Sequence, residues 1–432
     1  MQFPVSMQSR LCGLSALAAA LSACSAAPER ETTTVTTREL DIGGIVKMRR
    51  ETRTTETADD TEVEPSRPQS GILTAGDYDD ILNPDLYAKY ASRLAQQMGD
   101  DLPFIDTRTR VAVKIVDEAG RAVPQAQIVV TRKGGTLRLV SGADGVASFY
   151  PRHDRVSGLT RISATSDAGS ASRNITVSGQ DMQAVTLTVA GQAHAVRALD
   201  LVLVLDTTGS MGDEMAYLQA ELDKIVERLK RDAGNVDLRI GLIVYRDAGD
   251  DYIVRSYPLS GDIRSVRETL DLQDADGGGD TPEAVDRAMM AAAQMQWRGD
   301  AAKAVLLVAD APPHSEAVGA TLEATERLRS EGVQIVPVAA SGVEDSAQYV
   351  MRTMAVLTQG RYTFLTDDSG VGNAHAEPDV SCYVVTRLDQ LIARVLAGIV
   401  QGRRIEADRN EIIRTVGDYD SGRCRARQIA SR

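Results

Sequence analysis

Between residues 197 and 402, continuous apolar runs alternate with stretches whose apolar residues recur at helical spacing. The runs predict strands buried on both faces of a sheet, since a strand with one solvated face would alternate. They lie at 199–205, 238–245, 304–309 and 333–339. The amphipathic stretches predict helices at 213–231, 282–295, 317–330, 346–357 and 388–400. This alternation predicts a doubly wound, Rossmann-like α/β domain, whose ligands bind beyond the carboxyl ends of its strands.

Residues 108–192 have a different pattern, in which short alternating runs are separated by turn sequences. The runs read VAVKIV, VPQAQIVVTR, VASFY, TRISATS, SRNITVS and AVTLTVA, with DEAG and SGADG among the turns. Six or seven short strands with such turns predict a small antiparallel β-sandwich. The chain is therefore expected to contain more than one domain.

The segments around these two domains are less regular. Residues 25–75 are rich in Thr, Glu, Asp and Arg without a sustained apolar period, so we expect a disordered linker over 24–77. Residues 78–107 contain a short helix at 84–98, expected to pack on the next domain. The remaining 403–432 are interpreted as a C-terminal tail, either with a solvated basic face or as a terminal element pinned by Cys424.

The N-terminus has the features of an export signal. Residues 1–23 hold one charge, Arg10, followed by an apolar run at 11–21 that is too short to span a bilayer. The run ends in Leu-Ser-Ala-Cys24, which resembles the lipobox of bacterial lipoproteins. That resemblance implies an acylated Cys24 and a lipid-anchored protein of the cell envelope. Ser25, in place of an Asp, favours the outer membrane. The alternative is a chance cysteine in an ordinary cleavable signal.

Composition excludes several functions. The chain has 61 acidic and 48 basic residues, a net charge of −13 and 4% aromatic residues, which argues against nucleic-acid binding. Metalloprotease, P-loop and serine-hydrolase motifs are absent. Cys382 and Cys424 could form a disulfide in an export compartment, or could remain as two buried thiols.

Three loops that follow buried strands carry the candidate chemistry. The first contains Asp206, Thr208 and Ser210 at alternate positions, so their side chains can point to one side. The second reads GGGDTPE at 277–283, and the third is DAPPH at 310–314. Carboxylates and hydroxyls are hard oxygen ligands, which suit Mg²⁺ or Mn²⁺.

The strings LVLVLDTTGSM, IGLIVYRD, GGGDTPEAV and LLVADAPPH, in this order, resemble the von Willebrand factor type A (VWA) domain and its metal-ion-dependent adhesion site. The resemblance implies a Mg²⁺ site, or one for Mn²⁺ or Ca²⁺. Its ligands would be Asp206, Thr208, Ser210, Asp280 and Asp310. Asp280 stands where the family usually has Thr, so either Asp280 or Thr281 could be the second-loop ligand. The string around 111–149 similarly resembles a carboxypeptidase-regulatory-like, Ig-type sandwich.

A third aspartate at such a site has a physical consequence. Around a divalent ion, three carboxylates leave a charge near −1, which should strengthen metal binding but weaken binding of a partner's carboxylate. Arg246 could offset this charge if it lies nearby. Arg246 and Asp247 are thus candidates to contact the metal ligands without binding the metal themselves. An internal ion pair between them at the strand end is the alternative. The carboxylates themselves could instead cap helices and loops.

Together these features predict a non-enzymatic envelope lipoprotein that binds a protein partner through a metal on its VWA domain. One alternative is an envelope scaffold in which the metal only braces the loops. Another is a metal-assisted hydrolase with Asp247 or His314 as its general base. His314 is otherwise interpreted as a hydrogen-bonding loop residue.

Overall fold

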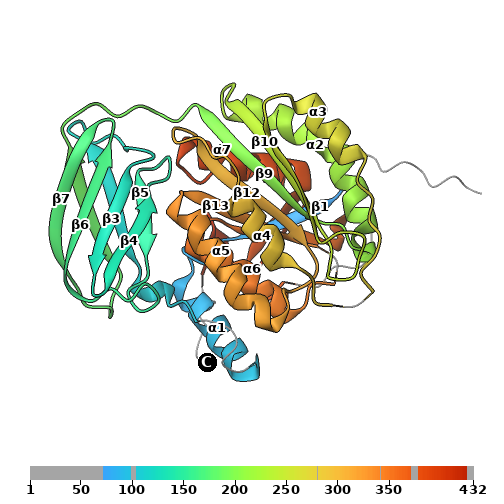
Figure 1. Ribbon diagram of the computed structural model, residues 1–432, viewed down its shortest axis with the longest axis horizontal. Helices are drawn as coiled ribbons and strands as arrows, with labels where there is room; N and C mark the ends of the chain where they lie inside the picture. Colours follow the sequence, from blue (N-terminus) through green and yellow to red (C-terminus); the bar gives the residue numbers. More distant parts are fainter. Residues whose placement is uncertain (1–71, 99–103, 280, 341, 371–377, 426–432) are drawn as a thin grey trace, which may run out of the picture. The chain divides into compact units, whose positions relative to one another are not determined.

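The computed structural model describes residues 72–98, 104–279, 281–340, 342–370 and 378–425 (Figure 1). The predicted signal, Cys24 and the linker up to residue 71 lie outside these residues, as does Asp280. No helix in the described ranges combines the length and apolar character needed to cross a membrane.

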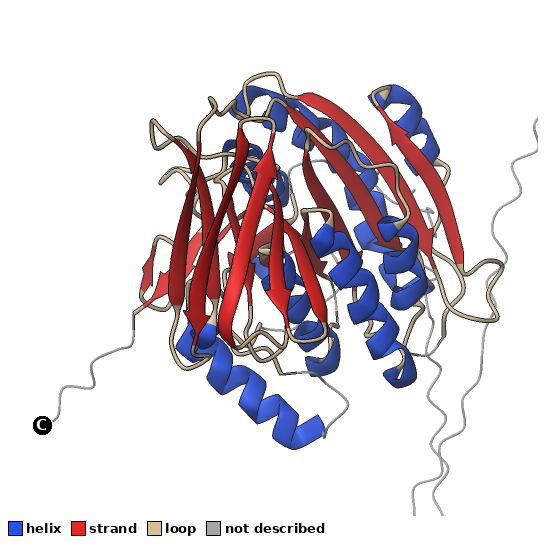
Figure 2. Cartoon of the chain, turned by 60° about the vertical axis from the view of Figure 1, so that its left-hand side comes forward, coloured by secondary structure: helices blue, strands red, loops and turns tan. Residues whose placement is uncertain are grey.

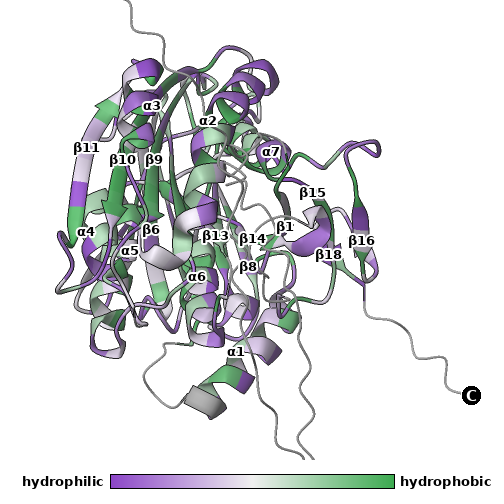
Figure 3. Ribbon diagram, turned by 90° about the vertical axis from the view of Figure 1, so that its right-hand side faces the viewer, coloured by the Kyte–Doolittle hydropathy of each residue, from purple (hydrophilic) through white to green (hydrophobic). Residues whose placement is uncertain are grey.

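The largest element is a nine-stranded mixed sheet in the order β11-β10-β9-β12-β13-β14-β1-β15-β16. Its strands are β1 (Thr74–Tyr78), β9 (Ala198–Asp206), β10 (Asp237–Tyr245), β11 (Val254–Ser260), β12 (Ala302–Ala309), β13 (Val333–Ala339), β14 (Tyr362–Thr366), β15 (Tyr383–Arg387) and β16 (Arg414–Val416). Every residue of β9 is buried, and β9 pairs in parallel with both β10 and β12. The four predicted strands correspond to β9, β10, β12 and β13, and the strongly apolar β10 is green in Figure 3.

Helices cover both faces of this sheet, as Figure 2 illustrates. They are α1 (Pro84–Met98), α2 (Gly212–Asp232), α3 (Ile263–Asp271), α4 (Val285–Ala293), α5 (Val318–Ser330), α6 (Asp345–Thr358) and α7 (Leu388–Gln401). Side chains alternate along β9, so Val202 and Val204 pack with α4, α5 and α6. Leu203 and Leu205 pack instead with α2 and α7. Two apolar cores on opposite faces confirm the predicted doubly wound α/β fold.

The first strand of the sheet corrects the predicted boundaries. Residues up to 77 were expected to form a linker, but Thr74–Tyr78 forms β1, which lies between β14 and β15 and is antiparallel to both. A Cβ on Gly76 would come within 2.7 Å of the Phe364 ring and 3.0 Å of Tyr383. This close approach explains a glycine in the middle of a fully buried strand. The α/β domain therefore begins before the sandwich and extends beyond 197–402.

Helix α1 forms where the sequence predicts it, but it packs on α6 of the α/β domain rather than on the sandwich that follows it. The Tyr87 hydroxyl lies 3.5 Å from Thr353 Oγ1, and the Tyr90 ring lies 6.1 Å from that of Tyr349. Between the helices, Arg352 forms a bidentate pair with Asp80 at 2.6 and 3.0 Å. Both side chains of this pair are 1% exposed.

The C-terminal segment is also part of the α/β domain. In the predicted tail, Arg414–Val416 forms β16 on the edge of β15, and β17 (Tyr419–Asp420) pairs with β18 (Arg423–Cys424). Cys382 and Cys424 are joined by a disulfide across 42 residues. Closing a loop of that length contributes about 4 kcal/mol in the chain-entropy model.

The sandwich consists of two sheets in the orders β5-β2-β8 and β4-β3-β6-β7. Its strands are β2 (Val111–Asp117), β3 (Gln127–Arg132), β4 (Gly135–Val140), β5 (Val146–Phe149), β6 (Gly158–Ser166), β7 (Gly169–Val177) and β8 (Gln183–Val189). Its core joins residues of both sheets, such as Ile115 and Ile162. The pairing is antiparallel except between β2 and β8, which are parallel.

The buried Asp80–Arg352 pair generates a stability prediction. We expect Arg352→Met to lower the free energy of unfolding by about 3–5 kcal/mol, because Asp80 would remain buried without its partner. The double variant Asp80→Leu, Arg352→Met should recover much of that loss. Urea denaturation measures both effects.

The control variant is Arg93→Met. It removes an ion pair with Asp379 that is nearly half exposed, so the free energy of unfolding should fall by about 1 kcal/mol or less. A double variant as unstable as the single one would contradict this account.

Candidate metal centre

The first loop begins where β9 ends, at the fully buried Asp206. Asp206 Oδ1 accepts hydrogen bonds from the Thr208 amide at 3.0 Å and from the Thr208 hydroxyl at 2.7 Å. The Thr208 and Ser210 hydroxyl oxygens are 3.3 Å apart. The predicted alternation therefore brings one carboxylate and two hydroxyls together at the carboxyl edge of the sheet.

The second loop lies against the first through its backbone. The Gly209 amide donates to Gly277 O at 3.1 Å, and the Gly278 amide donates to Asp250 Oδ1 at 3.1 Å. Gly278 has a φ of +68°, and a Cβ there would lie 3.0 Å from Thr208 Cβ. The glycines thus allow the two loops to approach closely. Thr281 is exposed.

Glu283, at the end of the second loop, is a buried acidic residue that the sequence prediction did not include among the ligands. It is 2% exposed, and its amide donates to Pro312 O at 3.0 Å. Burial raises its pKa to about 8, and the nearby Asp206 and Asp247 add to the shift. An acidic residue after a proline at a helix start is ordinarily solvent-exposed, so the sequence offered no signal for this burial.

The third loop contributes Asp310, directly after β12. Burial raises its pKa, whereas a hydrogen bond with Ser210 opposes that rise. Burial and the charge of Asp310 together raise the pKa of Asp206 to about 7. The structure thus groups Asp206, Thr208, Ser210 and Asp310 with Glu283. These groups are electrostatically coupled, with excess negative charge in a low-dielectric setting.

The donor types suit a hard divalent cation, although ligand atoms of Asp206, Glu283 and Asp310 do not all lie within 4.8 Å of one another. Asp206 Oδ2, Glu283 Oε2 and Asp310 Oδ1 are buried and lie beyond hydrogen-bonding distance of any donor among the described residues, although the buried Tyr245 hydroxyl is close enough to Asp206 to lower its pKa. Buried carboxylate oxygens are normally paired with a donor or a cation. With the Thr208 and Ser210 hydroxyls beside them, these oxygens are the ligand type that Mg²⁺ and Ca²⁺ prefer. When bound, the ion would supply the positive charge that the site lacks.

Arg246 and Asp247 have separate roles behind this site. The Arg246 guanidinium is 4% exposed and donates to Thr207 O and to Asp274 O, each at 3.1 Å. It therefore ties the first loop to the second and does not pair with Asp247. Asp247 instead accepts a hydrogen bond from His314 Nε2 at 2.9 Å, which raises the pKa of His314.

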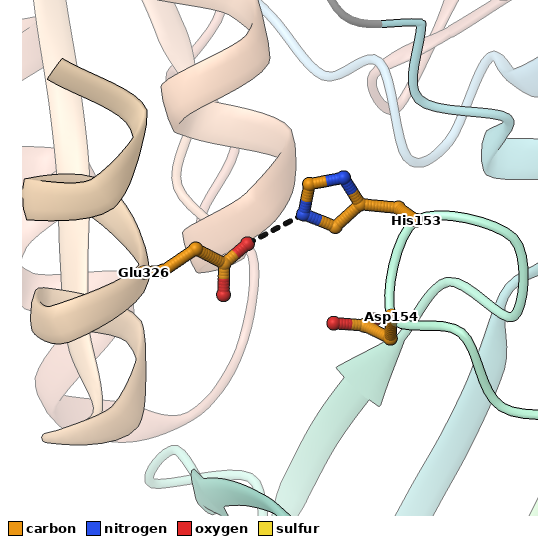
Figure 4. Close-up of side chains that lie close together, drawn as sticks. All are labelled: His153, Asp154 and Glu326. Atoms are coloured by element: carbon orange, nitrogen blue, oxygen red, sulfur yellow. Dashed lines mark hydrogen bonds and ion pairs between the residues drawn. The ribbon is translucent and has the colours of Figure 1, made fainter. Parts of the chain in front are cut away.

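A different acidic group lies where the sandwich meets α5 (Figure 4). Ligand atoms of His153, Asp154 and Glu326 lie within 4.8 Å of one another, close enough to hold a metal. The Arg329 guanidinium already contacts Asp154 at 2.8 Å and Glu326 at 2.9 Å. His153 Nε2 lies 2.6 Å from Glu326 Oε1. Because Arg329 supplies the positive charge that balances these carboxylates, we interpret the cluster as an ion-pair network that joins the sandwich to the α/β domain.

The α/β fold, with carboxylates and hydroxyls at its strand ends, is similar to that of a VWA domain. Residues 200–375 match the family model of the von Willebrand factor type A domain, which covers less than half of the chain. The chain is 32% identical over 124 residues, 28% of its length, to "Alpha-protein kinase vwkA" of Dictyostelium discoideum. It is 36% identical over 116 residues, 27% of its length, to "Putative ariadne-like RING finger protein R811" of Acanthamoeba polyphaga mimivirus.

The chain spans 20% and 11% of the lengths of these two relatives. Among solved structures, it is similar to the conserved hypothetical protein BatB from Bacteroides thetaiotaomicron. That match has 14% identity and a TM-score of 0.35, and it covers 47% of this chain and 100% of the other.

The stability that this ion-pair network contributes should decrease in acid. Burial alone would raise the pKa of Glu326, but Arg329 and His153 lower it to about 2. A depressed folded-state pKa stabilises the protein above the unfolded value of about 4.3, and this contribution is lost as pH falls towards 2. Glu326→Gln should remove this part of the acid dependence when unfolding by urea is followed from pH 7 to pH 3. Glu323→Gln, on the exposed face of α5, is the matched control. Identical acid profiles for Glu326→Gln and wild type would refute the assignment.

Proposed function

We propose that this protein is a lipid-anchored component of the bacterial cell envelope whose VWA domain binds a protein partner through a divalent metal. The proposed ligands are Asp206, Thr208, Ser210, Asp280 and Asp310, some of them through water. VWA domains generally mediate protein–protein interactions. A partner would complete the octahedral coordination of Mg²⁺.

The observation that carries this proposal is the set of unpartnered carboxylate oxygens on Asp206, Glu283 and Asp310. Burial, and after it their mutual repulsion, disfavours ionisation of these carboxyls, as the raised pKa values of Asp206 and Glu283 indicate. A buried site that accumulates like charges beside two hydroxyls costs stability unless it binds something. That cost favours a binding role for the site.

The protein contacts around the site favour binding over a purely structural metal. Arg246 already links the first and second loops, and Asp250 accepts from the Gly278 amide. The Gly209–Gly277 hydrogen bond adds a further link. Because these contacts brace the loops without an ion, we propose that the metal serves recognition, with the scaffold role as the alternative.

Glu283 affects which partner group would suit the site. With Asp280 as a ligand and Glu283 ionised, four carboxylates would surround the divalent ion, leaving a charge near −2. An incoming carboxylate would then be repelled. We therefore propose that the partner supplies a neutral oxygen, such as a hydroxyl, amide or backbone carbonyl.

A hydrolytic role is less well supported. The two residues that could act as general base, Asp247 and His314, are hydrogen-bonded to each other. This hydrogen bond links two neighbouring loops, and nothing among the described residues favours a catalytic role for either side chain.

Thermal unfolding with and without metal tests the site. In EDTA and then in Mg²⁺, Mn²⁺ or Ca²⁺, we expect a metal-dependent rise in stability. A ligand at 100 times its dissociation constant adds about 2.7 kcal/mol. The rise should disappear in the Ser210→Ala, Asp310→Ala double variant. Glu283→Gln should stabilise the metal-free protein at pH 7, because the Glu283 carboxyl, whose pKa is raised to about 8, otherwise has to take up a proton on folding, and should reduce the metal-dependent rise. Glu316→Gln, on an exposed residue, is the control.

The same variants separate recognition from bracing. Partner capture that needs Mg²⁺ and is lost in the double variant, with metal-free stability unchanged, would support recognition. A double variant that unfolds much more readily in EDTA would support the scaffold role. No rise with any metal would refute the metal site itself.

The proposed anchor has an independent test. Labelled palmitate should be incorporated into the wild-type protein and should not be incorporated into Cys24→Ser. We expect the wild type in the membrane fraction and the variant in the soluble fraction. Equal labelling of the two would contradict acylation at Cys24.

A further inference from the structure

A second site lies away from the proposed metal centre, at the C-terminal end of α7. A cavity of about 200 Å³ opens between this helix end, the loop after α6 and the sandwich. Its charged lining residues are Arg110, Arg361, Arg403, Arg404, Asp79 and Asp144. Four arginines against two aspartates give this lining, which we call the arginine cavity, an excess of positive charge.

Arg361 is the residue that calls for an explanation. After α6 ends, Gln359 has a φ of 60°, and Gly360 packs so tightly that a Cβ there would lie 1.8 Å from Ile335 O. This turn fixes the start of β14 and brings Arg361 under the protein surface. Its side chain is 12% exposed. A guanidinium so deeply placed normally finds acceptors for most of its five N–H groups.

The protein does not supply those acceptors. Arg361 makes no hydrogen bond with any described residue, and its Nη1 is buried without a partner. Its closest carboxylate is Asp77, with Nη1 at 3.6 Å from Oδ2, beyond hydrogen-bonding distance. Asp77 Oδ2 is already bonded to Arg404 at 2.8 Å, and Arg394 approaches Oδ1 at 3.9 Å. One carboxylate is therefore shared by three guanidinium groups.

Arg404, in contrast, is neutralised by the carboxylates around it. It hydrogen-bonds Asp77, Glu406 and Tyr419, but its Nη1 is buried and lies 3.8 Å from Asp79 without a hydrogen bond. Burial and the repulsion of Arg404 both lower the pKa of Arg361. The Nη1 atoms of Arg361 and Arg404 are enclosed by protein, so the donors left for a ligand in the cavity are Nε and Nη2 of Arg361, which have no acceptor among the described residues.

An oxyanion satisfies these donors. A planar guanidinium matches the oxygen spacing of phosphate and carboxylate groups, and two neighbouring guanidiniums favour the more highly charged phosphate. A volume of about 200 Å³ corresponds to roughly six or seven waters at ~30 Å³ each. This is enough space for a phosphate group with a small organic substituent.

We propose that the arginine cavity binds a phosphate group of a small molecule, with Arg361 as its main contact and Arg110, which also lines the cavity, as a second one. Arg110 contacts Met182 Sδ at 3.8 Å and forms no ion pair with the described residues, so its guanidinium remains available to the ligand. This site is independent of the proposed metal centre.

Calorimetric titration of the purified protein tests the proposal. Inorganic phosphate and glycerol 3-phosphate are titrated in EDTA, with chloride at matched ionic strength as the reference. We expect both phosphates to bind and Arg361→Met to weaken them at least roughly tenfold, since charge-assisted hydrogen bonds are lost. Tighter binding of glycerol 3-phosphate would identify an organic phosphate as the ligand type, and binding of inorganic phosphate alone would identify the free ion.

The controls separate this site from general charge effects and from the metal centre. Arg138→Met, on an exposed residue of β4, should leave phosphate binding unchanged, as should the Ser210→Ala, Asp310→Ala variant. If Arg361→Met fails to fold, Arg110→Met provides the test and should also weaken binding. Phosphate heats equal to those of chloride would overturn the proposal. So would unchanged affinity in a folded Arg361→Met or Arg110→Met variant.

Discussion

The α/β domain depends on β1 occupying the gap between β14 and β15. Its antiparallel pairing on both sides satisfies backbone groups that would otherwise be buried without partners. Through this strand, the β15–α7 unit and the disulfide-linked C-terminal segment join the sheet. Asp77 and Asp80, at the end of β1 and just beyond it, pair with Arg404 and Arg352. A segment that precedes the sandwich in sequence therefore completes the domain that follows it.

Buried charges in this protein fall into two groups, and the difference between them locates the candidate sites. Arg352 with Asp80, and Arg329 with Asp154 and Glu326, are balanced by neighbours within hydrogen-bonding distance. The carboxylates of Asp206, Glu283 and Asp310 are not balanced, and neither is the Arg361 guanidinium. Since an uncompensated buried charge is costly, the imbalances suggest ligands, a cation in one place and an oxyanion in the other.

The position of the candidate metal centre follows from the sheet. Asp206 and Asp310 come after the adjacent parallel strands β9 and β12, whose carboxyl ends meet at one edge. Gly278 lets the second loop approach this edge, and Arg246 holds the two loops from behind. Protein contacts thus hold these loops together at the sheet edge where the carboxylate oxygens lie.

The sequence by itself determined the elements with strong hydrophobic patterns. The strands β9, β10, β12 and β13 and the helices between them other than α3 were predictable because burial on both faces or along one stripe leaves a clear periodicity. The loops with Asp206, Thr208, Ser210 and Asp310 were identifiable for the same reason, since each follows such a strand. Short or exposed strands such as β11 and β16 carry little periodic signal, so they were not predicted.

Only the tertiary structure decided which distant segments share a neighbourhood. The pattern of Thr74–Tyr78, with Gly and Asp among its five residues, does not predict a buried strand, because its burial comes from β14 and β15. Glu283 and Arg361 have the sequence context of ordinary surface residues. Their burial, and hence their charge imbalance, arises from the third loop and from the turn at Gly360. Local sequence encodes periodicity, whereas the environment of a charge depends on residues far away along the chain.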